Sequence, residues 1–149
     1  MSHERSKACR LVSMEIDTHS IAEAAVVARQ LHAYNERDIE GFMACWADDA
    51  EIYAWPSVLL ASGASEIRAR HIERFREPDL YAHLISRLAV GGLVIDRERV
   101  TRNLAEGRGA LDVLGIYEVA DGKVRRAWFK QGAAILDVGD GPDDQRGPQ

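Results

Sequence analysis

Cysteine is scarce in this chain, and its placement argues against two common ways of stabilising a small protein. Only Cys9 and Cys45 occur among the 149 residues, far apart and without the CxxC spacing of zinc sites. His32, His71 and His83 likewise share no short metal-binding spacing. We therefore expect neither a disulfide framework nor a bound metal, and no motif in the sequence indicates a cofactor.

Long apolar runs and a surplus of positive charge are also missing. No stretch approaches the roughly 18 apolar residues of a membrane span, and residues 1–10 are polar where a signal peptide would be apolar. The 19 Lys and Arg residues against 24 Asp and Glu residues give a net charge of -5, which attracts neither phosphate backbones nor anionic lipids. The sequence therefore predicts a cytoplasmic protein that has neither nucleic acid nor a membrane as a partner.

What is present is the composition of one globular domain. Hydrophobic residues make up 46% and charged residues 29% of the chain. A chain of this length can form a single stable core without a disulfide or a structural metal. Residues 1–17 carry charges without an apolar stripe, and the tail is rich in Gly, Pro and Asp. We expect a disordered leader over 1–17, a single domain over 18–137 and a disordered tail over 138–149.

Helical periodicity is confined to the first half of the chain, where apolar residues recur every three or four positions. Polar caps and prolines mark the ends of the elements. The expected elements are a helix over 18–35, a short helix capped by Asp38 and carrying Trp46, a strand over 50–55 ended by Pro56, and, after a loop, a helix opened by Ser65 and Glu66 and ended by Glu77-Pro78-Asp79.

Beyond Pro78 the apolar period changes from 3.6 to about 2, which is typical of strands. Turn signals at Gly91-Gly92, Glu106-Gly107 and Asp121-Gly122 divide this half into hairpins. The expected strands are 80–90, 93–103, 108–119 and 123–131. Helices followed by an antiparallel meander predict an α+β fold, with the helices packed on one face of a curved sheet.

Three stretches of this sequence resemble a known superfamily: the run 34–50, then Gly63 with Ile67 and Arg68, and the run 117–124. Together they resemble the SnoaL-like and ketosteroid isomerase-like branch of the nuclear transport factor 2-like superfamily, over about residues 20 to 135. The resemblance implies a cone-shaped, cystatin-like α+β roll of three N-terminal helices on a strongly curved antiparallel sheet. It also implies a pocket inside the cone and an outer sheet face that often forms a dimer.

Ketosteroid isomerases in that superfamily remove a proton with an aspartate on the first strand. They hold the oxyanion with a tyrosine on the first helix and an aspartate on a later strand, which an apolar site keeps protonated and neutral. The resemblance places the base position on Ala54, the tyrosine on Gln30 and the second aspartate near Leu114 or Gly115. It therefore implies that the isomerase residues are absent.

Limonene epoxide hydrolases give a second resemblance, through 98–100 and 110–117. Their Asp-Arg-Asp arrangement activates water, helped by a tyrosine and an asparagine. The arginine corresponds to Arg99. The other four positions fall on Thr101, Phe129, Ile52 and Ala54. The resemblance therefore implies that the bases for water activation are absent too.

Both resemblances give the same inward face of the sheet, which predicts a mainly apolar cavity wall. The expected inward residues are Ile52, Ala54, Leu111, Val113, Gly115, Tyr117, Ala127 and Phe129, with Arg99 and Thr101 if that hairpin is in register. The expected outward residues are Asp112, Leu114, Ile116, Arg126, Trp128 and Lys130. An outer face that mixes aliphatic residues and a tryptophan with charges predicts a homodimer through that face.

Gln30 and His71 are the polar groups that the resemblance places near the pocket floor. A neutral His71 hydrogen-bonded to Gln30 could bind a carbonyl or shuttle a proton, or the two could be a structural pair inside the core.

Two further residues have alternative interpretations. Arg99 could face a ligand or form a salt bridge at the rim of the pocket. Trp55 could cover the pocket mouth or serve ordinary packing.

The leading hypothesis is a homodimeric protein that binds a small, largely apolar molecule in the cone, oriented by Gln30, His71, Arg99 and Thr101. The alternative is an enzyme of the steroid isomerase-like, polyketide cyclase-like or hydrolase-like class with His71 as acid and base. A third hypothesis is an interaction protein that resembles nuclear transport factor 2 and has a filled pocket. The sequence leaves open which of the three is right.

Overall fold

The computed structural model describes residues 20–137, so the expected leader and tail lie outside the described residues. The chain is helical from residue 20 to 36. Two further helices follow, α2 (Ile39–Met43) and α3 (Ala64–Arg74). The α+β fold with three helices at the N-terminal end is therefore confirmed within the described part of the chain. No helix in this part is both long and apolar enough to cross a membrane.

The two short helices begin in different ways: a side chain caps α2, whereas α3 follows a glycine and has no side-chain cap. The Asp38 carboxylate accepts the N–H of Gly41 at 3.0 Å and caps α2, as the sequence predicted. Before α3, Glu66 accepts the N–H of Ser62 at 2.8 Å. Gly63 has a φ of 87°, in a region that side chains other than glycine rarely adopt. These contacts fix the direction in which α3 leaves the sheet.

The second half of the chain is the expected meander. Its strands are β3 (Tyr81–Val90), β4 (Leu93–Leu104), β5 (Gly107–Ala120) and β6 (Lys123–Leu136), each antiparallel to the next. All three predicted glycine turns connect them, and β6 continues five residues beyond its expected end at 131. Glycines at the turns adopt positive φ, which is why these positions ended the strands in the sequence.

The first half contributes two strands rather than one. β1 (Trp46–Ala54) begins earlier than expected, so Trp46 lies on a strand and not on the short helix. β2 (Val58–Ser62), which was expected to be a loop, pairs with β1 as an antiparallel edge strand. Its run of apolar residues does not alternate, which is why the periodicity missed it. β1 also pairs in parallel with β6, so the sheet is not wholly antiparallel.

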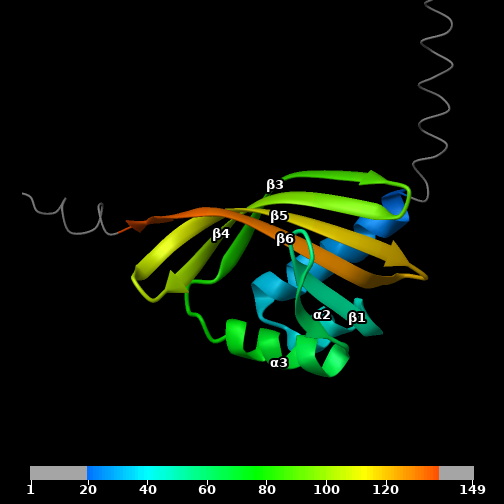
Figure 1. Ribbon diagram of the computed structural model, residues 1–149, viewed down its shortest axis with the longest axis horizontal. Coiled ribbons are helices and arrows are strands. Elements are labelled where there is room, and N and C mark those ends of the chain that lie inside the picture. Colours follow the sequence, from blue (N-terminus) through cyan, green and yellow to red (C-terminus); the bar gives the residue numbers. More distant parts are fainter. Residues whose placement is uncertain (1–19, 138–149) are drawn as a thin grey trace, which may run out of the picture.

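The six strands form one sheet in the order β2-β1-β6-β5-β4-β3. Figure 1 shows the long strands β3 to β6 arching over α2, α3 and the β1–β2 hairpin. Two groups of buried apolar side chains fill the space between the layers, one around Phe42 and Ile67 and the other around Leu80 and Leu111. Tyr34, Phe75 and Phe129 pack against both groups. The cavity described below lies where these groups meet, because its lining includes residues of both.

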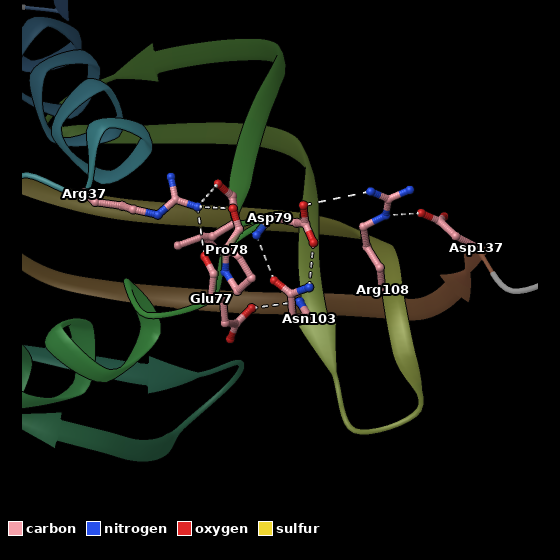
Figure 2. A network of polar contacts seen from close by, with 8 residues as sticks. Arg37, Glu77, Pro78, Asp79, Asn103, Arg108 and Asp137 are labelled. Atoms are coloured by element: carbon pink, nitrogen blue, oxygen red, sulfur yellow. Dashed lines mark hydrogen bonds and ion pairs between the residues drawn. The ribbon is translucent and has the colours of Figure 1, made fainter. Parts of the chain in front are cut away.

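A network of polar contacts ties the connection between α3 and β3 to its neighbours (Figure 2). The Arg37 guanidinium donates to the carbonyl oxygens of Glu77, Pro78 and Leu80 at 2.8, 2.9 and 3.1 Å. The side chain of Asn103 accepts the Asp79 N–H at 2.9 Å. These bonds hold the loop against β4 and fix the place of Glu77 beside the cavity.

Candidate functional site

The cone encloses a cavity of about 440 Å³, within the size range of small-molecule sites. Apolar side chains from the N-terminal helix and all six strands form about half of its wall: Leu31, Ile52, Ala54, Leu60, Ala82, Val100, Leu111, Val113 and Phe129. The prediction of a mainly apolar wall is therefore wrong in part, because polar and charged side chains form the rest. Trp55, half exposed beyond the end of β1, also lines the cavity. The wall could therefore enclose an apolar body of modest size.

The cavity brings together most of the residues that the sequence placed there. These are Gln30, Ile52, Ala54, Trp55, His71, Leu111, Val113, Tyr117 and Phe129. On β5 the inward residues alternate with exposed or half-exposed ones, as the period of a strand requires. Lys130, which was expected to face outward, is exposed but reaches the rim of the cavity.

The expected placement of Arg99 and Thr101 in the cavity is wrong. On β4 the buried positions are the even-numbered ones, so Glu98, Val100 and Arg102 line the cavity instead. Arg99 points to the outer face, where its guanidinium lies 3.7 Å from the Asp112 carboxylate. The resemblance fixed the inward face of this hairpin one residue out of step, and a one-residue error turns every side chain to the other face.

Glu98 overturns the expectation that the hollow contains no carboxyl group. Its side chain is only 4% exposed, and Oε2 has no hydrogen-bond partner among the described residues. Burial and, to a smaller extent, the nearby Asp96 charge raise the pKa of Glu98, Arg87 lowers it, and the net result is a pKa of about 7. The cavity therefore holds an acid group that changes charge near neutral pH.

Asp96, two residues earlier on the same face, is fully buried but lies outside the cavity lining. Arg87 on the neighbouring strand donates from Nε and Nη2 to its two oxygens at 2.6 and 2.8 Å. This paired geometry satisfies both charges. Asp96 and Arg87 therefore support the strand pair, and Glu98 is the carboxyl that faces the cavity.

Tyr117 supplies a neutral hydroxyl to the same cavity. It is fully buried, and burial together with the charges of Glu98 and Asp96 raises its pKa well above the usual value of 10. The hydroxyl therefore stays protonated and can donate a hydrogen bond. Gly115 leaves room for this ring, since a Cβ there would lie 3.1 Å from the Tyr117 hydroxyl oxygen and 3.2 Å from the Phe129 ring.

His71 lies in the cavity wall as expected, but its surroundings favour the neutral form. Nδ1 lies 2.8 Å from the Ile67 carbonyl oxygen, and the ring packs on Phe42 with centroids 4.3 Å apart. Burial lowers the pKa of His71 to about 4. The Gln30 amide donates to Val27 in its own helix at 3.4 Å, and no hydrogen bond joins Gln30 to His71 in the described structure. His71 is therefore a weak base at neutral pH.

Basic side chains gather along one part of the lining. Arg70, Arg74 and Arg102 come from α3 and β4, and Lys130 comes from β6. Tyr34 lies beside them, with its hydroxyl oxygen 3.5 Å from Nη1 of Arg74, and burial raises the pKa of this tyrosine. Within residues 20–137, no group of three His, Cys, Asp or Glu side chains is placed to hold a metal ion.

Comparison with known proteins adds the family. The model of the SnoaL-like domain matches residues 27–127. The chain belongs to this family. Comparison with curated protein sequences gave no match.

Solved structures similar to this SnoaL-like protein share its fold at low sequence identity. One is an uncharacterized cystatin-fold protein from Novosphingobium aromaticivorans, at 24% identity over 72% of this chain and 96% of that chain, with a TM-score of 0.68. A candidate ketosteroid isomerase from Kribbella flavida gives 21% identity over 81% and 84%, with a TM-score of 0.68. An LEH-like epoxide hydrolase from M. tuberculosis gives 16% over 76% and 85%, with a TM-score of 0.66. At such identities the likeness shows the cystatin-like fold alone.

Sequence reasoning missed Glu98, Tyr34 and the three arginines of this SnoaL-like cavity. A signal for Glu98 was present, because Val94 and Val100 are both apolar and both even-numbered. Side chains on a strand alternate between its two faces, so Val94, Glu98 and Val100 share one face. If the valines are taken as inward, Glu98 is inward too. The same signal would have placed Arg102 inward. Arg70 and Arg74 gave no such signal, since charged residues on a helix are usually solvated.

Proposed function

We propose that this SnoaL-like protein is an enzyme that binds a small molecule with a largely apolar body and transfers a proton with Glu98. This proposal rests on one observation: the cavity contains a buried carboxyl group, and one of its oxygens has no hydrogen-bond partner within residues 20–137. A general base is most effective when its pKa lies near the working pH, and the pKa of Glu98 is about 7.

Glu98 replaces His71 as the acid and base of the enzyme hypothesis. At pH 7 about half of the Glu98 side chains are ionised, and each can accept a proton and return it. His71, with a pKa of about 4, is neutral and weakly basic at that pH. The Tyr117 hydroxyl could donate to an oxygen on which charge develops, because it stays protonated. Proton transfer at carbon and activation of water are both open to this arrangement.

Titration of Glu98 by carbon-13 NMR of the glutamate carboxyl groups tests the premise. The Glu98 signal is assigned by its loss in Glu98→Gln. We expect a midpoint near pH 7. A midpoint near 4.5, the usual value for glutamate, would show a hydrated carboxylate and would contradict the proposed role.

Proton transfer is tested by exchange of the α-hydrogens of 2-tetralone, an apolar ketone, in heavy water. We expect catalysed exchange in the unaltered protein, with a rate that rises through pH 7 as Glu98 ionises. Glu98→Gln should lower the rate roughly 100-fold, the usual scale for a general base. Asp112→Asn, which alters an exposed carboxylate on the outer face, is the matched control and should change nothing. Equal rates in Glu98→Gln and the unaltered protein would overturn the proposal.

A second candidate is a binding protein without chemistry, which Ala54 favours, since a methyl group stands where the related isomerases carry their base. This candidate expects Glu98→Gln to keep its affinity for 2-tetralone while neither form exchanges its hydrogens. Calorimetry on both forms, beside the exchange rates, separates the two candidates.

We also propose a homodimer through the outer sheet face. The exposed side of β1 and β6 carries Tyr53 stacked on Trp128, with ring centroids 5.9 Å apart and planes 15° from parallel. Leu114 on β5, 37% exposed, adds apolar surface to that side of the sheet. A two-fold contact of this kind uses the same patch on both copies. Trp128→Lys should convert dimer to monomer in light scattering, and a monomeric unaltered protein would contradict this proposal.

A further inference from the structure

The cavity differs in charge from the protein around it. The whole chain carries a net charge of -5. The cavity lining nevertheless contains four basic side chains, Arg70, Arg74, Arg102 and Lys130, and one carboxyl, Glu98. Even with Glu98 ionised, the lining therefore carries three more positive than negative charges. An excess of positive charge in the cavity of an acidic protein favours an anionic ligand.

Glu77 neutralises only part of this charge. Its Oε1 accepts from Nε of Arg102 at 2.8 Å and from the N–H of Asn103 at 2.9 Å, and its Oε2 accepts from Nη2 of Arg102 at 2.7 Å. Oε2 also lies 3.8 Å from Nε of Arg74. Asn103 belongs to the network of Figure 2, which holds Glu77 in this position. The one carboxylate of this corner is thus already engaged with Arg102 and Arg74.

Arg70 has no such partner. It lies one residue before His71 on α3, is half-buried, and forms no ion pair with a carboxylate among the described residues. Burial and the positive charges of Arg74 and Arg102 lower its pKa, whereas Tyr34 works in the opposite direction. A guanidinium still keeps its proton under such conditions. None of the described carboxylates offsets its partial burial, and an anion in the cavity would do so.

We propose that the ligand of this cavity carries one carboxylate, which Arg70 binds through its guanidinium beside Arg74 and Arg102, while the apolar body packs against Leu111, Val113 and Phe129. The inference rests on the proposed function, since it names the class of substrate for the same cavity. A planar guanidinium matches a carboxylate through two parallel hydrogen bonds, and a single free arginine matches a single negative charge. Binding at this corner places the apolar body in the same cavity as Glu98.

Calorimetry with three matched probes tests the inference at pH 7.5: 2-naphthoate, 2-naphthalenemethanol and naphthalene-2-sulfonate. The three share an apolar body and differ in the head group. We expect 2-naphthoate to bind at least tenfold more tightly than the alcohol and more tightly than the sulfonate. The preference for the acid over the alcohol should weaken as salt concentration rises.

Arg70→Gln should remove most of that preference and leave the affinity for the alcohol unchanged. Arg70→Lys keeps the positive charge but loses the planar guanidinium, so it should retain part of the preference for the acid. It also shows whether a loss of binding in Arg70→Gln comes from a folding defect. Arg68→Gln is the matched control on the same helix, because Arg68 is exposed and pairs with Glu40 away from the cavity. It should bind all three probes as the unaltered protein does.

Equal affinity for acid and alcohol, or a preference that survives Arg70→Gln, would overturn the carboxylate inference and leave the role of Glu98 standing. Tighter binding of the sulfonate would show that the cavity selects a different class of anion. Absence of binding by all three probes would overturn the inference, and the titration of Glu98 would then decide the proposed function independently.

Discussion

Asp96 and Glu98 lie two residues apart on the same buried face of β4, yet their surroundings differ. Asp96 meets Arg87 in a paired contact with both oxygens, and it has no access to the cavity. Glu98 lines the cavity and has an oxygen without a partner. Burial by itself favours the protonated form of a carboxyl group, and a paired cation such as Arg87 offsets this effect.

The difference separates a carboxyl group that is paired with a cation from one that faces an open cavity, without reference to any relative. Both side chains are almost fully buried, so burial alone does not distinguish them. The two differ in what faces each carboxyl group: Arg87 on the adjacent strand faces Asp96, and the open cavity faces Glu98. Removing each group should therefore affect different properties of the protein.

The largest expected effect is on stability, from Asp96→Asn. The variant leaves the mostly buried Arg87 without its anion, which should lower the free energy of unfolding by about 3 kcal/mol. Glu98→Gln should change it by less than about 1 kcal/mol at pH 5, since the carboxyl is already neutral there. Urea denaturation of both variants measures the difference. Adding Arg87→Met to Asp96→Asn should recover part of the loss, and equal losses in the two single variants would contradict the comparison.

The second expected effect is a pH dependence of stability that Glu98 contributes. Asp96→Asn should reduce it without abolishing it, because burial is the largest cause of the raised Glu98 pKa. Because the pKa of Glu98 is raised from 4.5 to about 7, the folded chain binds more protons than the unfolded chain between these values. The free energy of unfolding should therefore fall as pH rises through this window, by up to about 3 kcal/mol in total. Relative to the unaltered protein, Glu98→Gln should gain stability steadily from pH 4.5 to 7.

His71 contributes the opposite slope. Because its pKa is lowered from 6.5 to about 4, the folded chain binds fewer protons than the unfolded chain between these values, and stability falls as pH drops. Between pH 4.5 and 6.5 the two slopes oppose each other in the unaltered protein. Relative to it, His71→Gln should gain stability as pH drops from 6.5 to 4. Urea titrations at several pH values test both variants, and parallel pH profiles would show that neither shift exists.

A smaller effect is expected at Gly115, which pairs with Asp96 across the strands and lies against Tyr117. Gly115→Ala should push the Tyr117 hydroxyl and the Phe129 ring away from their places and cost about 1 to 2 kcal/mol. It should also weaken binding of 2-naphthoate. Gly132→Ala is the control, since a Cβ there meets nothing closer than 3.6 Å. Thermal unfolding and calorimetry measure the two effects.

The smallest effect is expected from Arg99→Gln, on the outward side of the same strand. Its guanidinium is half exposed and lies 3.7 Å from Asp112, a contact worth less than about 0.5 kcal/mol. The variant should leave the Glu98 titration and probe binding unchanged. An altered Glu98 midpoint would mean that Arg99 faces the cavity after all, and the comparison on β4 would then be wrong.

The inward face was predicted correctly for β5 and wrongly for β4, and the two strands show why. On β5 the resemblance placed Leu111, Val113 and Tyr117 inward, although Leu114 and Ile116 on the outward side are apolar too. On β4 the buried face carries three charged residues, Asp96, Glu98 and Arg102, as well as valines. The valines are therefore only a weak signal for this face, because the burial of its charged residues depends on an arginine from β3 and on an open cavity.

The sequence by itself determined the α+β class, the four-strand meander and the turns between its strands, because glycine conformation and apolar period are local properties. Only the tertiary structure decided that β2 is a strand, that β1 runs parallel to β6, and that Glu98 reaches the cavity while Arg99 does not. These outcomes depend on contacts between different segments of the chain, such as β1 with β6 and Arg87 on β3 with Asp96 on β4. The charge state of a buried side chain follows from what surrounds it in space, and neighbours in sequence do not specify that environment.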